Sequence, residues 1–199
     1  MSQVYYNKIV SKIAEDQRIR YGIVYGNEKI VFIKVGADRT IRGHQDKYIQ
    51  IARRVHARLG ATVICASNPD VGYDAQEAAD KAMIAKVAAD CGFAEYEVHF
   101  VGTSDGGYQI LRLAQQVAQT KKILGINPSL ISKEDLTAQL QKLPQVEKCL
   151  IFGAKDEAVD CVPFLQQQAC SNLEIRIVEG ANHEFKGMVD RFIELIDLV

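Results

Sequence analysis

Apolar and polar positions follow two patterns along the chain, one typical of strands and one typical of helices, and the two patterns alternate. Short apolar runs bounded by glycine, proline or asparagine are typical of strands, whereas apolar residues spaced three and four apart are typical of amphipathic helices. Residues 29–35 form an almost continuous apolar run, as expected for a strand covered on both faces. Residues 46–60 instead follow the helical spacing, and Gly60 marks the end of that helix.

The same alternation continues to the end of the sequence. Strand patterns and helix patterns follow each other with short connections, which predicts an α/β fold with a mostly parallel central sheet and helices on both faces. We expect one domain over residues 1–199. The later strands are expected at 61–69, 97–101, 121–129, 148–156 and 173–183, and the later helices at 74–92, 107–119, 132–144, 162–170 and 184–199.

The N-terminal part of the sequence predicts an antiparallel hairpin. Residues 18–24 and 29–35 both have strand character, and Gly26-Asn27 between them resembles a tight turn. We expect this hairpin to add an antiparallel edge to the otherwise parallel sheet.

Composition and charge narrow the class of protein. Hydrophobic residues make up 48% and charged residues 25%, with a formal net charge of −1, so the basic surface of a nucleic-acid-binding protein is not expected. No apolar stretch has the length of a membrane span, and the first ten residues do not resemble a signal peptide, so we expect a cytoplasmic protein.

Dispersed cysteines without a C-x-x-C pair argue against a disulfide framework and a structural zinc site, and no metal or organic cofactor is expected. These cysteines are Cys65, Cys91, Cys149, Cys161 and Cys170.

A glycine-flanked serine lies where an expected strand meets an expected helix. Residues 102–106 read GTSDG and fit the pattern G-x-S-x-G around Ser104. In this pattern the serine occupies a tight turn, and the glycines allow the strand and the helix to approach each other. Ser104 could act as a helix cap, or as a nucleophile held at the edge of the sheet where parallel strands end.

A serine nucleophile needs a base, and the base needs an acid to orient it. Of the four histidines, His183 follows the last expected strand, whereas His56 and His99 lie inside a helix and a strand and His44 precedes the serine. Asp156 follows the penultimate strand, with Glu157 and Asp160 as nearby alternatives. Serine, acid and histidine therefore occur in the order Ser–Asp–His, each beyond the end of a different strand.

With these segments the sequence resembles the α/β-hydrolase superfamily over nearly its whole length. The residues that carry the resemblance are GTSDGG, FGAKDEAV, GANHEF and the stretch from IKVGADR to the strand that ends at Pro69. The resemblance implies a small serine hydrolase without a cap domain, because only about fifteen residues, 130–144, separate the NPS segment from the acid-bearing strand. It implies an ester or thioester as substrate and an acyl-enzyme intermediate. It also implies an oxyanion hole made by the backbone N–H of Asp105 and that of Ala37 or Asp38.

Two features depart from the family pattern. Many members carry His-Gly at the start of the oxyanion loop, whereas only Gly36 is present here, and Asp105 places a carboxylate beside the nucleophile. We expect that carboxylate to face solvent at the first turn of its helix. Arg39 and Arg42 could attract an anionic group of the substrate, although ordinary surface arginines are the simpler interpretation.

Two alternatives remain open at the level of sequence. A hydrolase-fold protein with an inactive site could serve in binding or scaffolding, and an unrelated doubly wound fold of the flavodoxin type would explain the alternation but not the three site segments. The sequence does not indicate an oligomeric state.

Overall fold

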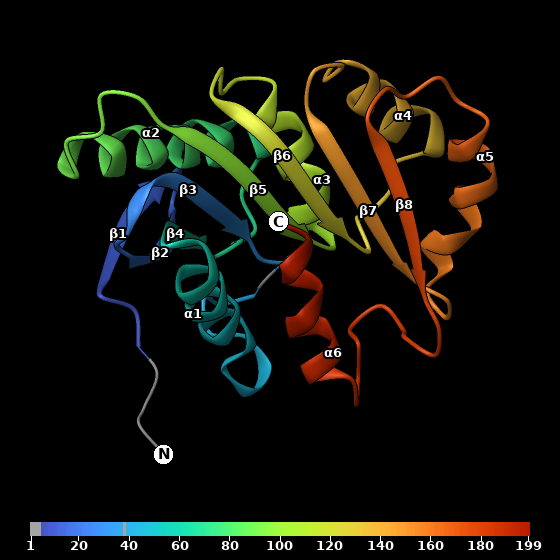
Figure 1. The fold of residues 1–199 in the computed structure, drawn as a ribbon, viewed down its shortest axis with the longest axis horizontal. Helices are drawn as coiled ribbons and strands as arrows, with labels where there is room; N and C mark the ends of the chain where they lie inside the picture. Colours follow the sequence, from blue (N-terminus) through green and yellow to red (C-terminus); the bar gives the residue numbers. More distant parts are fainter. Residues whose placement is uncertain (1–4, 38) are drawn as a thin grey trace.

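The computed structural model describes residues 5–37 and 39–199, and it places a twisted eight-stranded sheet at the centre of the molecule (Figure 1). The strand order is β1-β2-β4-β3-β5-β6-β7-β8. From β4 onward each neighbouring pair is parallel, whereas β2 runs antiparallel to both β1 and β4. The strands are β1 (Lys8–Ala14), β2 (Gln17–Val24), β3 (Asn27–Lys34), β4 (Ala61–Ala66), β5 (Glu97–Thr103), β6 (Thr120–Ile126), β7 (Glu147–Gly153) and β8 (Leu173–Val178).

Helices cover both faces of the sheet, as the sequence predicts (Figure 1). On one face lie α1 (Lys47–Leu59) and α6 (Val189–Glu194), followed by the 3₁₀ turn η3 (Leu195–Leu198). The other face carries α2 (Tyr73–Asp90), α3 (Asp105–Ala114), α4 (Lys133–Gln141) and α5 (Val162–Gln166). Within the described parts of the chain, no helix has both the length and the apolar character needed to cross a membrane.

The connection between β6 and β7 is short. Residues 127–146, all of them described, contain α4 and no other helix. This agrees with the expectation that no cap domain covers the sheet edge.

The antiparallel N-terminal hairpin is present, but its position differs from the prediction. It is formed by β1 and β2, and the two strands predicted to pair at Gly26-Asn27 are separated by β4. A Cβ on Gly26 would lie 2.1 Å from the carbonyl oxygen of Gly60, because the chain crosses closely over the start of β4. The glycine that suggests a hairpin turn is therefore required by this crossing.

The last helix begins later than the pattern 184–199 predicts. Phe185 has φ 55° and Gly187 has φ 76°, and a left-handed backbone cannot continue an α-helix. The side chain of Phe185 is nevertheless buried at 1% exposure, so this residue packs into the core although it lies in a turn and not in a helix.

The central strands β3 and β5 are buried over most of their length, and their carboxyl ends lie at one edge of the sheet. β3 and β5 lie side by side in parallel, and the side chains of Phe32 and Phe100 pack edge to face on one side of them. Because β3, β5, β6, β7 and β8 all run in the same direction, their carboxyl ends meet at one edge of the sheet. Residues that follow these strands come together there.

A buried ion pair supports the end of β3. The Nζ of Lys34 lies 2.9 Å from a carboxylate oxygen of Asp80 and donates to the carbonyl of Ser67 at 3.1 Å. Tyr21 donates its hydroxyl to the other oxygen of Asp80 at 2.8 Å. Lys34 and Asp80 are 1% and 2% exposed, so their charges are compensated within the protein.

Removal of one partner of this pair should be more harmful than removal of both. Lys34→Met leaves the Asp80 carboxylate buried without a cation, and we expect it to lower the free energy of unfolding by about 3–5 kcal/mol. The double variant Lys34→Met/Asp80→Leu should recover part of that loss. Urea unfolding of the three proteins measures this, and a Lys34→Met variant within about 1 kcal/mol of the parent would contradict it.

Candidate active site

Ser104 occupies a sharp turn between β5 and α3. Its backbone has φ 53° and ψ −126°, a conformation that is rare for a residue with a side chain. A Cβ on Gly102 would lie 2.4 Å from the carbonyl oxygen of Gly106, and a Cβ on Gly106 would lie 2.3 Å from that of Val35. Both glycines are therefore needed for strand, turn and helix to approach so closely.

The structure brings Ser104, His183 and Asp156 together in one chain of hydrogen bonds. The Nε2 atom of His183 lies 2.8 Å from the hydroxyl oxygen of Ser104, and its Nδ1 atom lies 2.8 Å from a carboxylate oxygen of Asp156. The other carboxylate oxygen of Asp156 accepts the backbone N–H of Ala158 at 3.1 Å. Asp156 is buried at 6% exposure, whereas the side chain of His183 is 44% exposed, so the imidazole is accessible from solvent.

The other histidines and acids considered from the sequence occupy other environments. The Nδ1 of His56, in α1, lies 2.9 Å from the carbonyl oxygen of Ala61. His99 is buried in β5, and this burial lowers its pKa. His44 is in the 3₁₀ turn η1 (His44–Asp46), while the alternative acids Glu157 and Asp160 are in η2 (Glu157–Cys161).

The loop after β3 passes directly beside the serine. A Cβ on Gly36 would lie 3.2 Å from the Cβ of Ser104, so the next residue, Ala37, is close to the turn. Asp105 is the first residue of α3, where a backbone N–H has no partner within the helix. Ala37 and Asp105 line one pocket, which brings the two predicted donor residues to the same place. Asp38, the alternative donor residue, lies outside the described residues.

This pocket has a volume of about 370 Å³. Besides Ala37 and Asp105, its wall comes from the loop between β4 and α2 and from the first turn of α2. The further lining residues are Asn68, Pro69, Asp70, Val71, Gly72, Tyr73 and Gln76.

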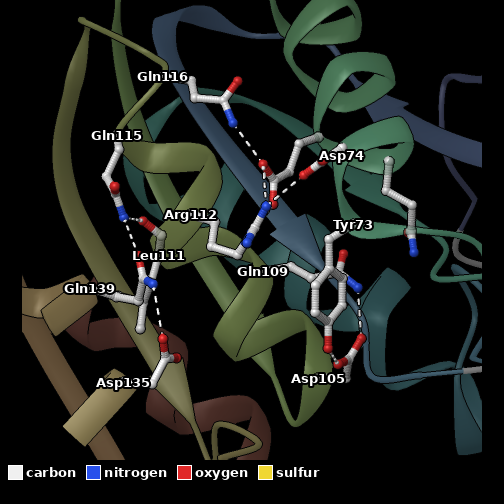
Figure 2. Close-up of polar contacts among 12 residues, drawn as sticks. Tyr73, Asp74, Asp105, Gln109, Leu111, Arg112, Gln115, Gln116, Asp135 and Gln139 are labelled. Atoms are coloured by element: carbon white, nitrogen blue, oxygen red, sulfur yellow. Dashed lines mark hydrogen bonds and ion pairs between the residues drawn. The ribbon is translucent and has the colours of Figure 1, made fainter. Parts of the chain in front are cut away.

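Asp105 is half-buried, and its carboxylate is bound by neighbouring side chains, which corrects the prediction that it faces solvent. Its carboxylate accepts hydrogen bonds from the Tyr73 hydroxyl at 2.7 Å, the Asn68 amide at 2.9 Å and the Gln109 amide at 2.6 Å. Figure 2 shows Tyr73 and Gln109 directed at this carboxylate. Burial and the contact with Asp105 raise the pKa of Tyr73, which keeps its hydroxyl protonated as a donor. Three neutral donors therefore hold the charge of Asp105 in place.

An ion-pair network behind Tyr73 joins α2 to α3 (Figure 2). Arg112 of α3 pairs with Glu77 and, at 2.7 Å, with Asp74, and its guanidinium carbon lies 5.5 Å from the centre of the Tyr73 ring. The network supports the side chain that contacts Asp105.

The two arginines of the loop after β3 are engaged with carboxylates of the same chain. Arg39 lies 2.6 Å from a carboxylate oxygen of Glu184, the residue after His183, and Arg42 binds both oxygens of Asp46 at 2.8 and 3.0 Å. Both pairs are solvent-exposed. A role of these arginines in substrate binding stays a prediction.

Two residues at the site were missed from the sequence. Asn127 donates from its side-chain amide to the carbonyls of Asn182 and His183, and its side-chain oxygen accepts the N–H of Gly153. The hydroxyl oxygen of Ser129 lies 3.3 Å from that of Ser104. Their position after β6 could have indicated them in the sequence, because polar residues that directly follow this strand lie at the same sheet edge as the serine.

The cysteines are free thiols, and several are unsuited to act as nucleophiles. Burial raises the pKa of Cys65 to about 12 and that of Cys149 and Cys161 to about 11, so the reactive thiolate is disfavoured at neutral pH. Within residues 5–37 and 39–199, no group of three or more His, Cys, Asp or Glu side chains is arranged to hold a metal ion.

Comparison with known proteins gives similarity in structure alone. No protein-family model and no curated protein sequence matches the chain. A structure of an alpha-beta serine hydrolase homologue from Coxiella burnetii matches 98% of both chains with a TM-score of 0.73 and 17% identity. Est1E from Butyrivibrio proteoclasticus matches 96% of both chains, with a TM-score of 0.73 and 11% identity.

Dienelactone hydrolase from Anabaena variabilis matches 94% of this chain and 93% of its own, with a TM-score of 0.74 and 15% identity. These matches cover 94% to 98% of this chain, and they exclude the flavodoxin-type alternative. The chain has the α/β-hydrolase fold.

Proposed function

We propose that the protein is a serine hydrolase that cleaves an ester or thioester through Ser104, His183 and Asp156. The observation that carries this proposal is the hydrogen-bond chain from buried carboxylate to imidazole to hydroxyl, with both contacts at 2.8 Å. Such a chain activates a serine hydroxyl, which is otherwise a weak nucleophile. The α/β-hydrolase fold and the names of its structural matches, which include a serine hydrolase homologue and an esterase, agree with it.

In this mechanism the Ser104 oxygen attacks the carbonyl carbon while His183 Nε2 takes the hydroxyl proton. Asp156 holds the imidazole with Nδ1–H directed at its carboxylate and stabilises the imidazolium that forms. Collapse of the tetrahedral intermediate breaks the bond to the alcohol or thiol, which leaves with the proton from His183. Water then attacks the acyl-enzyme by the same steps, which releases the acid and restores the serine.

The negative charge on the carbonyl oxygen needs donors on the other side of Ser104. We assign this role to the backbone N–H groups of Asp105 and Ala37, with Asp38 as the alternative to Ala37. One such donor contributes about 3 kcal/mol to the stabilisation of the transition state in known serine hydrolases.

The alternative function is binding or scaffolding on an inactive site. The strained backbone of Ser104 argues for catalysis, because such a conformation costs roughly 1–3 kcal/mol and is typical of functional sites. The alignment of His183 with the serine also favours catalysis, since a binding role does not need it.

Ser104→Ala should abolish covalent labelling by a fluorophosphonate probe and hydrolysis of short-chain 4-nitrophenyl esters. The reason is that the probe and the ester both require the activated hydroxyl. Ser129→Ala is the matched control, because it removes a hydroxyl only 3.3 Å from that of Ser104, whereas the imidazole of His183 is hydrogen-bonded to Ser104. Mass spectrometry of the labelled protein checks the result. Folded wild-type protein that takes up no label would overturn the proposed function.

The pocket beside Ala37 and Asp105 suggests which substrate groups are accepted. Asp70 and Asp105 are among the residues that line it, and the lining residues in the described part of the chain include no lysine or arginine. A carboxylate about 6 Å from a substrate anion in a water-like medium raises the free energy of the bound anion by about 0.7 kcal/mol, and two aspartates line this pocket. We therefore propose an ester whose group in this pocket is uncharged.

A matched pair of substrates tests this preference. The 4-nitrophenyl ester of adipic acid half-amide should have a kcat/KM about tenfold higher than that of the half-acid, since the two differ only in one charge. Asp70→Asn should narrow the ratio to about threefold, and added salt should narrow it as well. A preference for the half-acid would instead favour attraction by Arg39 or Arg42.

A further inference from the structure

We propose that Asn127 is a positioning residue. It holds the loop that carries His183 and the loop that carries Asp156 in the relative position that catalysis requires. The inference rests on the proposed function of Ser104, His183 and Asp156. It assigns to the end of β6, which carries none of these three residues, the task of fixing the distance between two of them.

The side chain of Asn127 uses both its donor and its acceptor on the two loops. Its amide nitrogen donates to the carbonyl of His183 at 2.9 Å and to that of Asn182 at 3.3 Å. Its oxygen accepts the backbone N–H of Gly153 at 2.7 Å. Gly153 is the last residue of β7, three residues before Asp156. One amide group therefore connects the loops of the base and the acid.

The backbone of Asn127 is fixed as firmly as its side chain. Its N–H donates to the carbonyl of Ile151 at 2.7 Å, and the residue is 1% exposed. Its φ of 44° lies in the left-handed region, which asparagine tolerates better than most residues with a side chain. This conformation turns the chain away from β6 and directs the amide toward the neighbouring loops.

The two loops also contact each other directly through their backbones. The N–H of Lys155 donates to the carbonyl of Ala181 at 2.8 Å, and a Cβ on Gly153 would lie 2.6 Å from the same oxygen. Asn127 adds the contacts at Asn182 and His183, so it holds the loop at the position of the base itself. Because His183 is 44% exposed, surrounding side chains only partly enclose its imidazole.

The consequence for catalysis follows from geometry. A displacement of about 1 Å between reacting groups can lower a rate by about 10²-fold. Without the Asn127 amide, the carbonyl of His183 loses its partner, and the imidazole no longer has a single orientation toward Ser104. Substrate binding depends on the pocket at Ala37 and Asp105, which Asn127 does not line, and should change little.

Two variants separate the side chain from the backbone conformation. Asn127→Gly keeps the left-handed backbone available and removes every side-chain contact. Asn127→Asp keeps the acceptor for the Gly153 N–H and replaces the two donor contacts by a carboxylate that faces two carbonyl oxygens. Asn172→Gly is the matched control, because Asn172 also has a left-handed backbone (φ 54°) and donates to a carbonyl, that of Pro144, at the opposite end of the sheet.

We expect both Asn127 variants to lower kcat on a 4-nitrophenyl ester by about 10- to 100-fold with KM within about threefold, and Asn172→Gly to leave both constants unchanged. The second readout is the NMR resonance of the His183 Nδ1 proton, which the hydrogen bond to Asp156 shifts downfield. It should be lost or broadened in the two Asn127 variants at a pH at which all variants are folded.

The NMR readout does not require turnover, so it tests the positioning role even if the protein proves to have no esterase activity. A folded Asn127→Gly variant with kcat within threefold of the parent and an unchanged Nδ1 resonance would overturn the inference. If Asn127→Gly does not fold, Asn127→Asp with wild-type kcat and resonance overturns it equally.

Discussion

The site depends on the close approach of β3, β5 and α3, which is possible only because two positions lack a side chain. The carbonyl of Val35 occupies the space where a Cβ of Gly106 would be, and the carbonyl of Gly106 occupies that of Gly102. This contact imposes the strained backbone of Ser104 and places the first N–H of α3 beside the loop that follows β3. Burial of the central strands supplies the stability that offsets the strain.

The charges around the serine are mostly engaged within the chain. The carboxylate of Asp105 accepts hydrogen bonds from neutral donors. Lys34 forms a buried ion pair with Asp80, and Arg39 forms an exposed ion pair with Glu184. Within the described residues, His183 is the ionisable group that contacts the hydroxyl of Ser104, and Asp156 contacts the other ring nitrogen of His183. An environment of this kind gives one proton pathway at the serine and keeps the other charges at fixed positions.

The sequence predicted the sheet type, the helices on both faces and the approach of Ser104, Asp156 and His183, because each depends on local period or on position after a strand. It misplaced the hairpin, since the insertion of β4 between β2 and β3 is a long-range pairing that Gly26-Asn27 does not reveal. The side-chain direction of Asp105 depends on Asn68, from the loop after β4, and on Tyr73, from the first turn of α2. The role proposed for Asn127 likewise follows from contacts with residues 26 to 56 positions away.

The short connection through α4 also makes this fold a convenient starting point for engineering. The contacts with the serine end at Ser129, and Ile131, two residues later, is 67% exposed. A guest segment inserted there would leave the loops of Asp156 and His183 intact, and the entropic cost of closing a longer loop grows only slowly with its length. Selectivity for larger substrates could thus be added as a separate module, while the chemistry stays with the parent scaffold.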